Sequence, residues 1–147
     1  MRFLSAIFAL SLISTPVFAA KAHREALKEL STKAKAGSSE VKTNCGCAVP
    51  VSVDQKSFDA VKAEKVGDFK SNVGYEIQYI GSTTKEFCSD AESKKLFCSN
   101  VKKITVYCEV KGDVDAKYDS RGKSMSIYTT SQMNSGGYKM KSIMESW

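Results

Sequence analysis

The sequence contains a single histidine, His23, and this scarcity excludes most histidine-based chemistry. A Ser–His–Asp or Cys–His apparatus needs a histidine to carry the proton, and His23 falls in a predicted peripheral helix, where a packed or half-exposed histidine is ordinary. Zinc sites usually combine spaced cysteine pairs with histidines, yet the chain has one Cys-x-Cys and no second pair. Phosphate-binding glycine loops and conspicuous carboxylate pairs are also missing. The sequence therefore predicts no catalytic residue, no metal site and no cofactor.

Apolar runs long enough to cross a membrane are lacking, and the main apolar run lies at the N-terminus. Residues 1–19 comprise Arg2, an apolar run over 3–13, and then Pro16 and small residues, which is the layout of a secretory signal peptide. Because the run is shorter than the roughly 20 residues that span a bilayer, it is not read as an anchor. Cleavage is expected after Ala19, and the mature chain is expected to be exported, to a periplasm or outside the cell.

Arginine is sparse, and lysine supplies most of the formal net charge of +6. The lysines are spread along the chain, with no arginine cluster and no compact basic run, so nucleic acid is not expected as a partner. An unknown protein or envelope component is the expected partner. Lysine-mediated binding to anionic surfaces is kept as a weaker alternative.

The pattern after the expected cleavage point divides into an N-terminal segment, residues 20–42, and a single domain, residues 43–147. Apolar residues recur at helical spacing in the first segment, as an amphipathic helix requires; they are His23, Ala26, Leu27, Leu30 and Ala34. Gly37 is the expected helix end, and a polar linker is expected to follow it.

Three further elements are predicted before the centre of the chain. Residues 47–53 alternate as a half-buried strand, and Pro50 places this strand at a sheet edge or at a strand start. Asp54 is expected to cap a short helix with Phe58 and Val61 facing inward. The segment 75–80 is rich in aromatic and β-branched residues and is predicted to be a strand.

The second half is predicted to contain a helix, three strands and a terminal helix. Thr83 and Glu86 have capping-box spacing, so a helix is expected from there to Asn100. Alternating residues over 103–110, 113–119 and 123–130 predict an antiparallel three-strand meander. A short C-terminal helix follows from the spacing of Met140, Ile143, Met144 and Trp147. The predicted fold is α+β: a small antiparallel sheet of four or five strands, packed with three or four helices and reinforced by disulfides.

The five cysteines are Cys45, Cys47, Cys88, Cys98 and Cys108, all of them disulfide candidates. In an oxidising compartment cysteines usually pair, so at most two intrachain bridges and one remaining thiol are expected. Cys45 and Cys47, two apart in an extended segment, are too far separated to bond each other. Cys108 is expected to pair with Cys47 or Cys88, and Cys98 with one of the others. Cys45 is then expected to reach Cys98 or to remain the odd thiol.

Two functions compete at this stage. The first is a small exported, non-catalytic binding or structural protein stabilised by disulfides, and the second is a thiol–disulfide oxidoreductase using Cys45-Gly46-Cys47. Tyr107 and Tyr128 fall on the outward parity of their strands, where exposed aromatics would make a binding surface. A helix covering that side of the sheet is the alternative.

Overall fold

The computed structural model describes residues 16–132 and 135–147, with side chains from residue 20 onward. The expected signal segment, residues 1–19, lies outside this range except for the backbone of 16–19, which begins the first helix. The elements in chain order are α1 (Pro16–Cys45), β1 (Val51–Val53), α2 (Gln55–Asp59), the 3-10 turn η1 (Ala63–Lys65), α3 (Val66–Phe87), α4 (Ala91–Asn100), β2 (Lys103–Cys108), β3 (Asp115–Asp119), β4 (Ser124–Thr129) and α5 (Gly136–Met144). None of the described helices is both long and apolar enough to span a bilayer.

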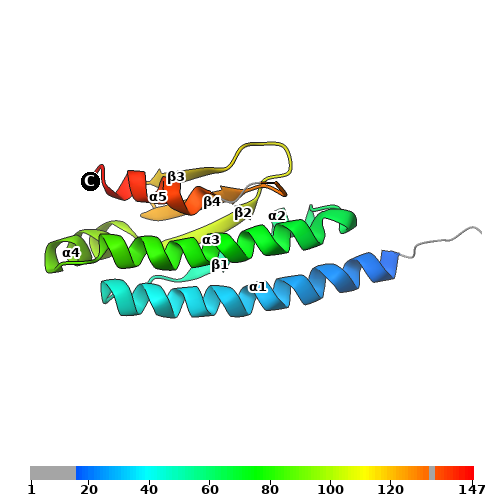
Figure 1. The fold of residues 1–147 in the computed structure, drawn as a ribbon, viewed down its shortest axis with the longest axis horizontal. Helices are drawn as coiled ribbons and strands as arrows, with labels where there is room; N and C mark the ends of the chain where they lie inside the picture. Colours follow the sequence, from blue (N-terminus) through cyan, green and yellow to red (C-terminus); the bar gives the residue numbers. More distant parts are fainter. Residues whose placement is uncertain (1–15, 133–134) are drawn as a thin grey trace, which may run out of the picture.

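The fold is α+β, as predicted, and consists of a helical layer on one side of a four-stranded sheet. The helices α1, α3 and α5 lie side by side along the molecule (Figure 1). They follow the sheet from edge to edge, because α1 contacts β1 and α5 contacts β3. One continuous core, from Ala26 in α1 to Met144 in α5, fills the space between the layers.

The first helix is longer than predicted, and the polar linker after Gly37 does not exist. Val41 and Cys45 continue the buried stripe that begins at Ala26, so α1 runs on to Cys45. Gly37 does not end the helix; it allows α1 to pack closely against α3. A Cβ at this position would lie 2.8 Å from Cγ2 of Ile77 in α3, closer than carbon atoms approach.

The strand predicted at residues 75–80 is wrong, because this segment forms the middle of α3. Its buried residues Val66, Phe69, Val73, Ile77 and Ile80 recur every three or four positions, which is the helical period. Gly74 and Gly81 flank this segment, and glycines often mark the ends of elements. Gly74 and Gly81 instead lie where side chains of α1 pack against α3.

The helix predicted from Thr83 also begins elsewhere. Thr83 and Thr84 are buried residues inside α3, and the next helix, α4, starts after the N-cap residue Asp90. The Asp90 carboxylate accepts a hydrogen bond from the Ser93 backbone N–H at 2.8 Å. This bond also holds the pKa of Asp90 below its ordinary value.

The sheet is mixed, with order β1-β2-β4-β3, so the predicted antiparallel meander is wrong in its strand order. β1 and β4 both pair with β2 in parallel, and only β3 and β4 are antiparallel. The strands predicted over 103–110, 113–119 and 123–130 are present as β2, β3 and β4, and β1, which is shorter than the predicted strand 47–53 and preceded by Pro50, is an edge strand as expected. β3 carries Asp115, Lys117 and Asp119 on its outward side, and such a polar strand suits the second edge.

A buried carboxylate, Glu76, joins α3 to the N-terminus of α5. Its Oε1 accepts from the Gly136 N–H at 2.9 Å and its Oε2 from the Gly137 N–H at 2.7 Å. Ser135, the N-cap residue of α5, makes no side-chain capping bond, so Glu76 supplies the cap from another helix. Burial raises the pKa of Glu76, while the two N–H bonds act against this shift.

The Gly136-Gly137 pair allows this close approach. A Cβ on Gly136 would lie 2.6 Å from Cγ2 of Ile127, and a Cβ on Gly137 would lie 2.4 Å from Cβ of Tyr79. Larger residues would therefore push α5 away from α3 and β4. The terminal helix predicted from Met140, Ile143 and Met144 is present, and its seat on the sheet depends on these two glycines.

Replacing Glu76 with glutamine should lower the free energy of unfolding by about 2 kcal/mol, because the amide nitrogen would face a backbone N–H and leave a buried donor unsatisfied. Urea denaturation measures the loss. The exposed Glu86 on the same helix provides the control, and Glu86→Gln should change stability by only about 0.5 kcal/mol. Equal effects of the two substitutions would contradict the capping role of Glu76.

Candidate functional site

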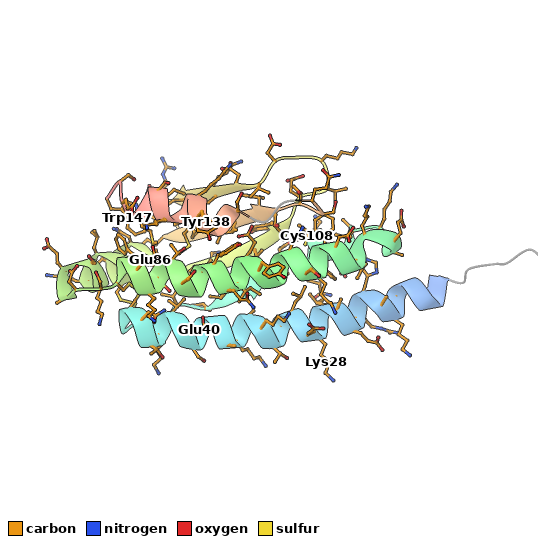
Figure 2. All side chains as sticks on the ribbon, in the orientation of Figure 1. Lys28, Glu40, Glu86, Cys108, Tyr138 and Trp147 are labelled. Atoms are coloured by element: carbon orange, nitrogen blue, oxygen red, sulfur yellow. A yellow bond between two sulfur atoms is a disulfide. The ribbon has the colours of Figure 1, made fainter. Side chains whose placement is uncertain are left out.

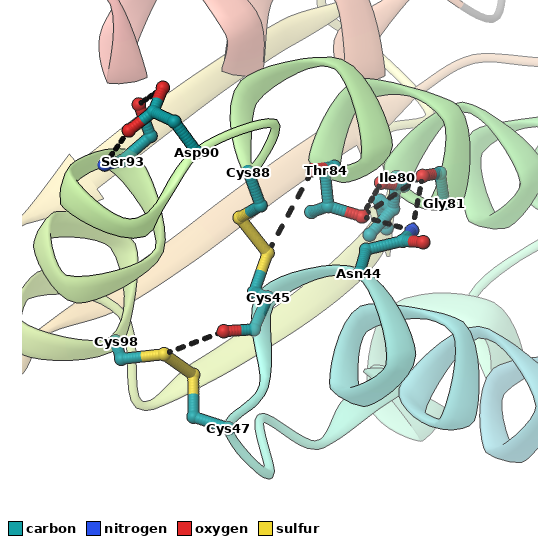
Figure 3. The surroundings of a disulfide bond; sticks show 10 residues. All are labelled: Asn44, Cys45, Cys47, Ile80, Gly81, Thr84, Cys88, Asp90, Ser93 and Cys98. Atoms are coloured by element: carbon teal, nitrogen blue, oxygen red, sulfur yellow. Dashed lines mark hydrogen bonds between the residues drawn. A yellow bond between two sulfur atoms is a disulfide. The ribbon is translucent and has the colours of Figure 1, made fainter.

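Four cysteines form two disulfides at one end of the molecule, and the prediction of a disulfide-stabilised fold is confirmed. Cys45, the last residue of α1, bonds Cys88 at the C-terminal end of α3. Cys47 bonds Cys98 in α4. Figure 3 shows the two bridges one above the other, joining the end of α1 to the corner between α3 and α4.

The surroundings of the bridges reinforce this corner. Asn44 donates from Nδ2 to the carbonyl oxygen of Gly81 at 3.0 Å and to the Thr84 hydroxyl at 3.2 Å (Figure 3). Sγ of Cys98 lies 3.4 Å from the carbonyl oxygen of Cys45. Because a disulfide sulfur carries no hydrogen, this is a sulfur–oxygen contact and not a hydrogen bond.

The predicted pairing of Cys108 is wrong, because Cys108 is a free, buried thiol. Cys108 ends β2, four residues beyond Ile104, the register partner of Val51. Cys47 precedes Val51 by four residues, and in parallel strands this places it toward the opposite end of the sheet. Because α3 returns the chain between the parallel strands β1 and β2, its C-terminal Cys88 also lies at that opposite end. Cys45 is likewise bonded, not the odd thiol.

The interpretation of Cys45-Gly46-Cys47 as one redox pair is also not supported by the geometry. The two residues belong to different disulfides, and Cys45 has 2% of its surface exposed. Gly46 has a φ of 83° and turns the chain after α1, so the segment is not an extended strand. The turn directs Cys45 toward α3 and Cys47 toward α4.

His23 has a structural environment. Its Nε2 lies 2.6 Å from the carbonyl oxygen of Val61, and its ring meets Phe58 edge-on with centroids 5.9 Å apart. Asp54 caps α2 by accepting from the Ser57 N–H at 2.7 Å, as predicted, and Phe58 and Val61 are buried. The described residues contain no group of three or more His, Cys, Asp or Glu side chains placed to hold a metal ion.

The two faces of the sheet differ sharply in burial. Most inward residues are buried, namely Val51, Ile104, Val106, Cys108, Ala116, Met125, Ile127 and Thr129. On the outward side no residue is buried, and we call this side the open face; its residues are Ser52, Lys103, Thr105, Tyr107, Asp115, Lys117, Asp119, Ser124, Ser126 and Tyr128. The helices α1, α3 and α5 all lie on the other side (Figure 1). The predicted outward parity of Tyr107 and Tyr128 therefore leads to a solvent-facing surface.

The register arranges the open face in rows across the strands. One row contains short hydroxyl side chains and ends at a lysine; it comprises Ser52, Thr105, Ser126 and Lys117. The adjacent row contains Tyr107 and Tyr128, which are register partners, followed by Asp115. The open face thus has a row of short hydroxyl side chains, which we call the hydroxyl track, next to a row that contains two larger aromatic side chains.

The two tyrosines form the last row of the open face, at the C-terminal ends of β2 and β4. Their rings stack with centroids 5.2 Å apart and planes 19° apart. Nζ of Lys117 lies 5.1 Å from the centroid of the Tyr128 ring, within the range of a cation–π contact. Each ring is thus held by a neighbour in a fixed orientation on the sheet.

A shallow polar cleft of about 400 Å³ adjoins the Tyr128 end of the open face. Its lining residues include Glu109, Asp115, Lys117, Tyr128 and Lys139. Lys139 reaches from α5 around the edge strand, where it donates to the carbonyl oxygen of Val114 and lies 3.9 Å from the Asp115 carboxylate. Residues of both charge signs therefore lie beside the tyrosine pair.

Sequence reasoning found the tyrosines but missed Lys117, Lys139 and the hydroxyl track. The outward parity of the three long strands was readable, and it would have assigned Lys117 and Ser126 to the same face. Their adjacency required the order β2-β4-β3, which the predicted meander did not have. Comparison of the chain with protein-family models, with curated protein sequences and with solved structures gave no match.

Peptide mapping without reduction should yield two linked pairs, Cys45–Cys88 and Cys47–Cys98. Replacing both Cys47 and Cys98 with serine opens a loop of 51 residues and should lower the free energy of unfolding by about 4 kcal/mol in the chain-entropy model. Guanidinium denaturation of the variant against the parent protein measures this loss. A linked peptide containing Cys108 would contradict the assignment.

Cys108 should be unreactive in the folded protein. Burial, with a smaller contribution from the nearby Asp54 carboxylate, raises the pKa of its thiol to about 12, so almost no thiolate exists at neutral pH. Titration with a chromogenic disulfide reagent should detect no thiol in the native protein and one thiol after unfolding without reductant. Rapid reaction of the native protein would show that the thiol is accessible.

Proposed function

We propose that this chain is an exported, disulfide-stabilised, non-catalytic module that binds a polypeptide partner through the open face. Two observations support the exported setting. Residues 1–19 have the layout of a signal peptide, and two disulfides are typical of proteins that fold in an oxidising compartment.

The single observation that carries the binding function is the stacked, partly exposed tyrosine pair on a sheet with only one covered side. Tyrosine provides large, rigid contact area with a polar tip, and it loses little conformational entropy on binding. Stacking between Tyr107 and Tyr128, and the position of Lys117 against Tyr128, reduce this cost further. Aromatic residues are enriched in protein–protein interfaces for these reasons.

The chemistry around the tyrosines favours a polypeptide over a small apolar ligand. Serine and threonine hydroxyls both donate and accept hydrogen bonds, so the hydroxyl track of Ser52, Thr105 and Ser126 suits backbone amides and polar side chains. The charged residues of the open face have both signs and lie at its margins. Aromatic residues next to polar and charged side chains are a usual composition of a protein-binding surface.

The remaining structure keeps this surface in one shape. The inward side chains of the same strands are buried against α3 and α5. This packing fixes the backbone of the strands, and so it also fixes the positions of the outward side chains. The two disulfides hold the corner of α1, α3 and α4 at one end of the sheet. A preorganised surface binds without an added ordering cost.

Site-specific photocrosslinking in the producing cells tests this function. A photoreactive phenylalanine analogue replaces Ser126 on the open face, and the matched control carries it at the exposed Ser82 on the helical side. A protein adduct is expected at Ser126 and not at Ser82. In the Ser126 background, Tyr107→Ser with Tyr128→Ser should reduce the adduct yield by about tenfold or more, because tyrosine is among the residues that contribute most to interface energy.

Folding of the crosslinking variants is checked by circular dichroism, since the tyrosine side chains lie outside the core. An adduct of twice the chain mass would identify a second copy as the partner. Absence of an adduct at Ser126, equal adducts at both positions, or a yield independent of the tyrosines would overturn the proposal.

A further inference from the structure

The solvent side of α1 carries a line of cations that the linear sequence does not make obvious. Lys21, Lys28, Lys35 and Lys42 are spaced seven residues apart, and Arg24 lies beside them. At 3.6 residues per turn these five residues fall within an arc of about 60°, opposite the buried stripe. We call this surface the α1 basic face. It extends for about 32 Å at 1.5 Å per residue.

Two of the three acidic residues of α1, Glu29 and Glu40, lie on a different side of the helix. Glu29 accepts from Lys70 of α3 at 3.0 Å and forms an ion pair with Lys33 at 3.2 Å. These lysines hold the pKa of the Glu29 carboxyl below its ordinary value. Glu40 also faces α3, because a Cβ on Gly81 would lie 2.0 Å from its Oε2. Charge is therefore segregated across α1, with Glu29 and Glu40 toward α3 and the cations toward solvent.

The cations of this face are almost free of acidic neighbours. In the described part of the chain, no carboxylate lies within ion-pair distance of Arg24, Lys28, Lys35 or Lys42. Lys21 has one, Glu25 at 3.8 Å, and both side chains are about two-thirds exposed, so water screens the pair. The face thus keeps nearly its full positive charge.

The intervening residues leave the lysines as the most prominent groups. The hydroxyls of Thr32, Ser39 and Thr43 turn back to the helix and donate to carbonyl oxygens four residues earlier. Figure 2 shows Lys28 pointing away from the rest of the molecule. Figure 1 shows that α1 forms one long margin of the fold, so the α1 basic face can lie along a flat partner.

We propose that the α1 basic face docks the protein on the surface of an anionic phospholipid bilayer. Four of its five cations are lysines, which act as point charges suited to a diffuse layer of phosphates. Single-stranded nucleic acid binding combines basic grooves with aromatic stacking platforms, and His23, the only aromatic ring in α1 from residue 20 onward, is engaged by Phe58 and Val61. A straight line of flexible cations therefore fits a planar charged surface better than it fits a single nucleic-acid strand.

Docking at this face is electrostatic and involves no insertion. The apolar stripe of α1 is already buried in the core, and the exposed large hydrophobic residues of the described chain lie outside this helix. Each basic residue near an anionic membrane contributes about a fivefold gain in partitioning. The proposal is independent of the open face, which belongs to the sheet and not to α1.

Vesicle co-sedimentation of the purified exported protein tests this docking. The protein should bind vesicles of phosphatidylcholine containing phosphatidylglycerol and should not bind pure phosphatidylcholine. Lys28→Gln with Lys35→Gln should lower partitioning by about 25-fold, and glutamine preserves the helix because its propensity equals that of lysine. Bound protein should be released at high salt, because the interaction is screened.

The matched control is Lys94→Gln with Lys95→Gln in α4, which removes the same charge from two other exposed helix positions. This variant should change partitioning by no more than about twofold, because screening limits distant charges. Equal losses for the two double variants would show that net charge alone is responsible, and would overturn the proposal. Failure to bind the anionic vesicles, or binding of duplex or single-stranded DNA in their place, would also overturn it.

Discussion

The packing of α1 along α3 is the contact on which the rest of the structure depends. It buries the stripe from Ala26 to Cys45 against the side of α3 that carries Ile77 and Ile80. Close approach requires small residues, and Gly37 and Gly81 provide them, since a Cβ at either would collide with the facing helix. The contact also fixes what remains outside, because burying one side of α1 turns its cations to solvent.

The second consequence is the one-sided sheet. Because α1, α3 and α5 pack next to one another, all three lie on the same side of the strands, and the opposite side stays open. The buried Glu76 carboxylate fastens α5 into this layer by binding two backbone N–H groups at its N-terminus. Burying the Glu76 carboxylate costs free energy, and its bonds to the Gly136 and Gly137 N–H groups offset that cost.

The disulfides reinforce a geometry that the chain connection already imposes. Parallel β1 and β2 need a return segment, and α3 provides it, so the end of α3 and the start of β2 lie at one end of the sheet. Cys45, Cys47, Cys88 and Cys98 all fall at that end, and Cys108 falls at the other. The same topology that pairs the four cysteines therefore isolates the fifth, in a buried position where it is a weak acid.

Periodicity in the sequence determined the elements whose pattern is local. The alternation of β2 and β4, the spacing of α5 and the Asp54 cap all follow from neighbouring residues, and so does the outward parity of Tyr107 and Tyr128. Prediction from the sequence was wrong where the role of a residue is a contact with a segment far away along the chain. Glycines that look like helix ends allow helices to pack closely, and the strand-like composition of residues 75–80 is buried on a helical period. Only the tertiary structure decided the strand order, the cysteine pairs, the open face and the segregated charges of α1, because each depends on which segments become neighbours in space.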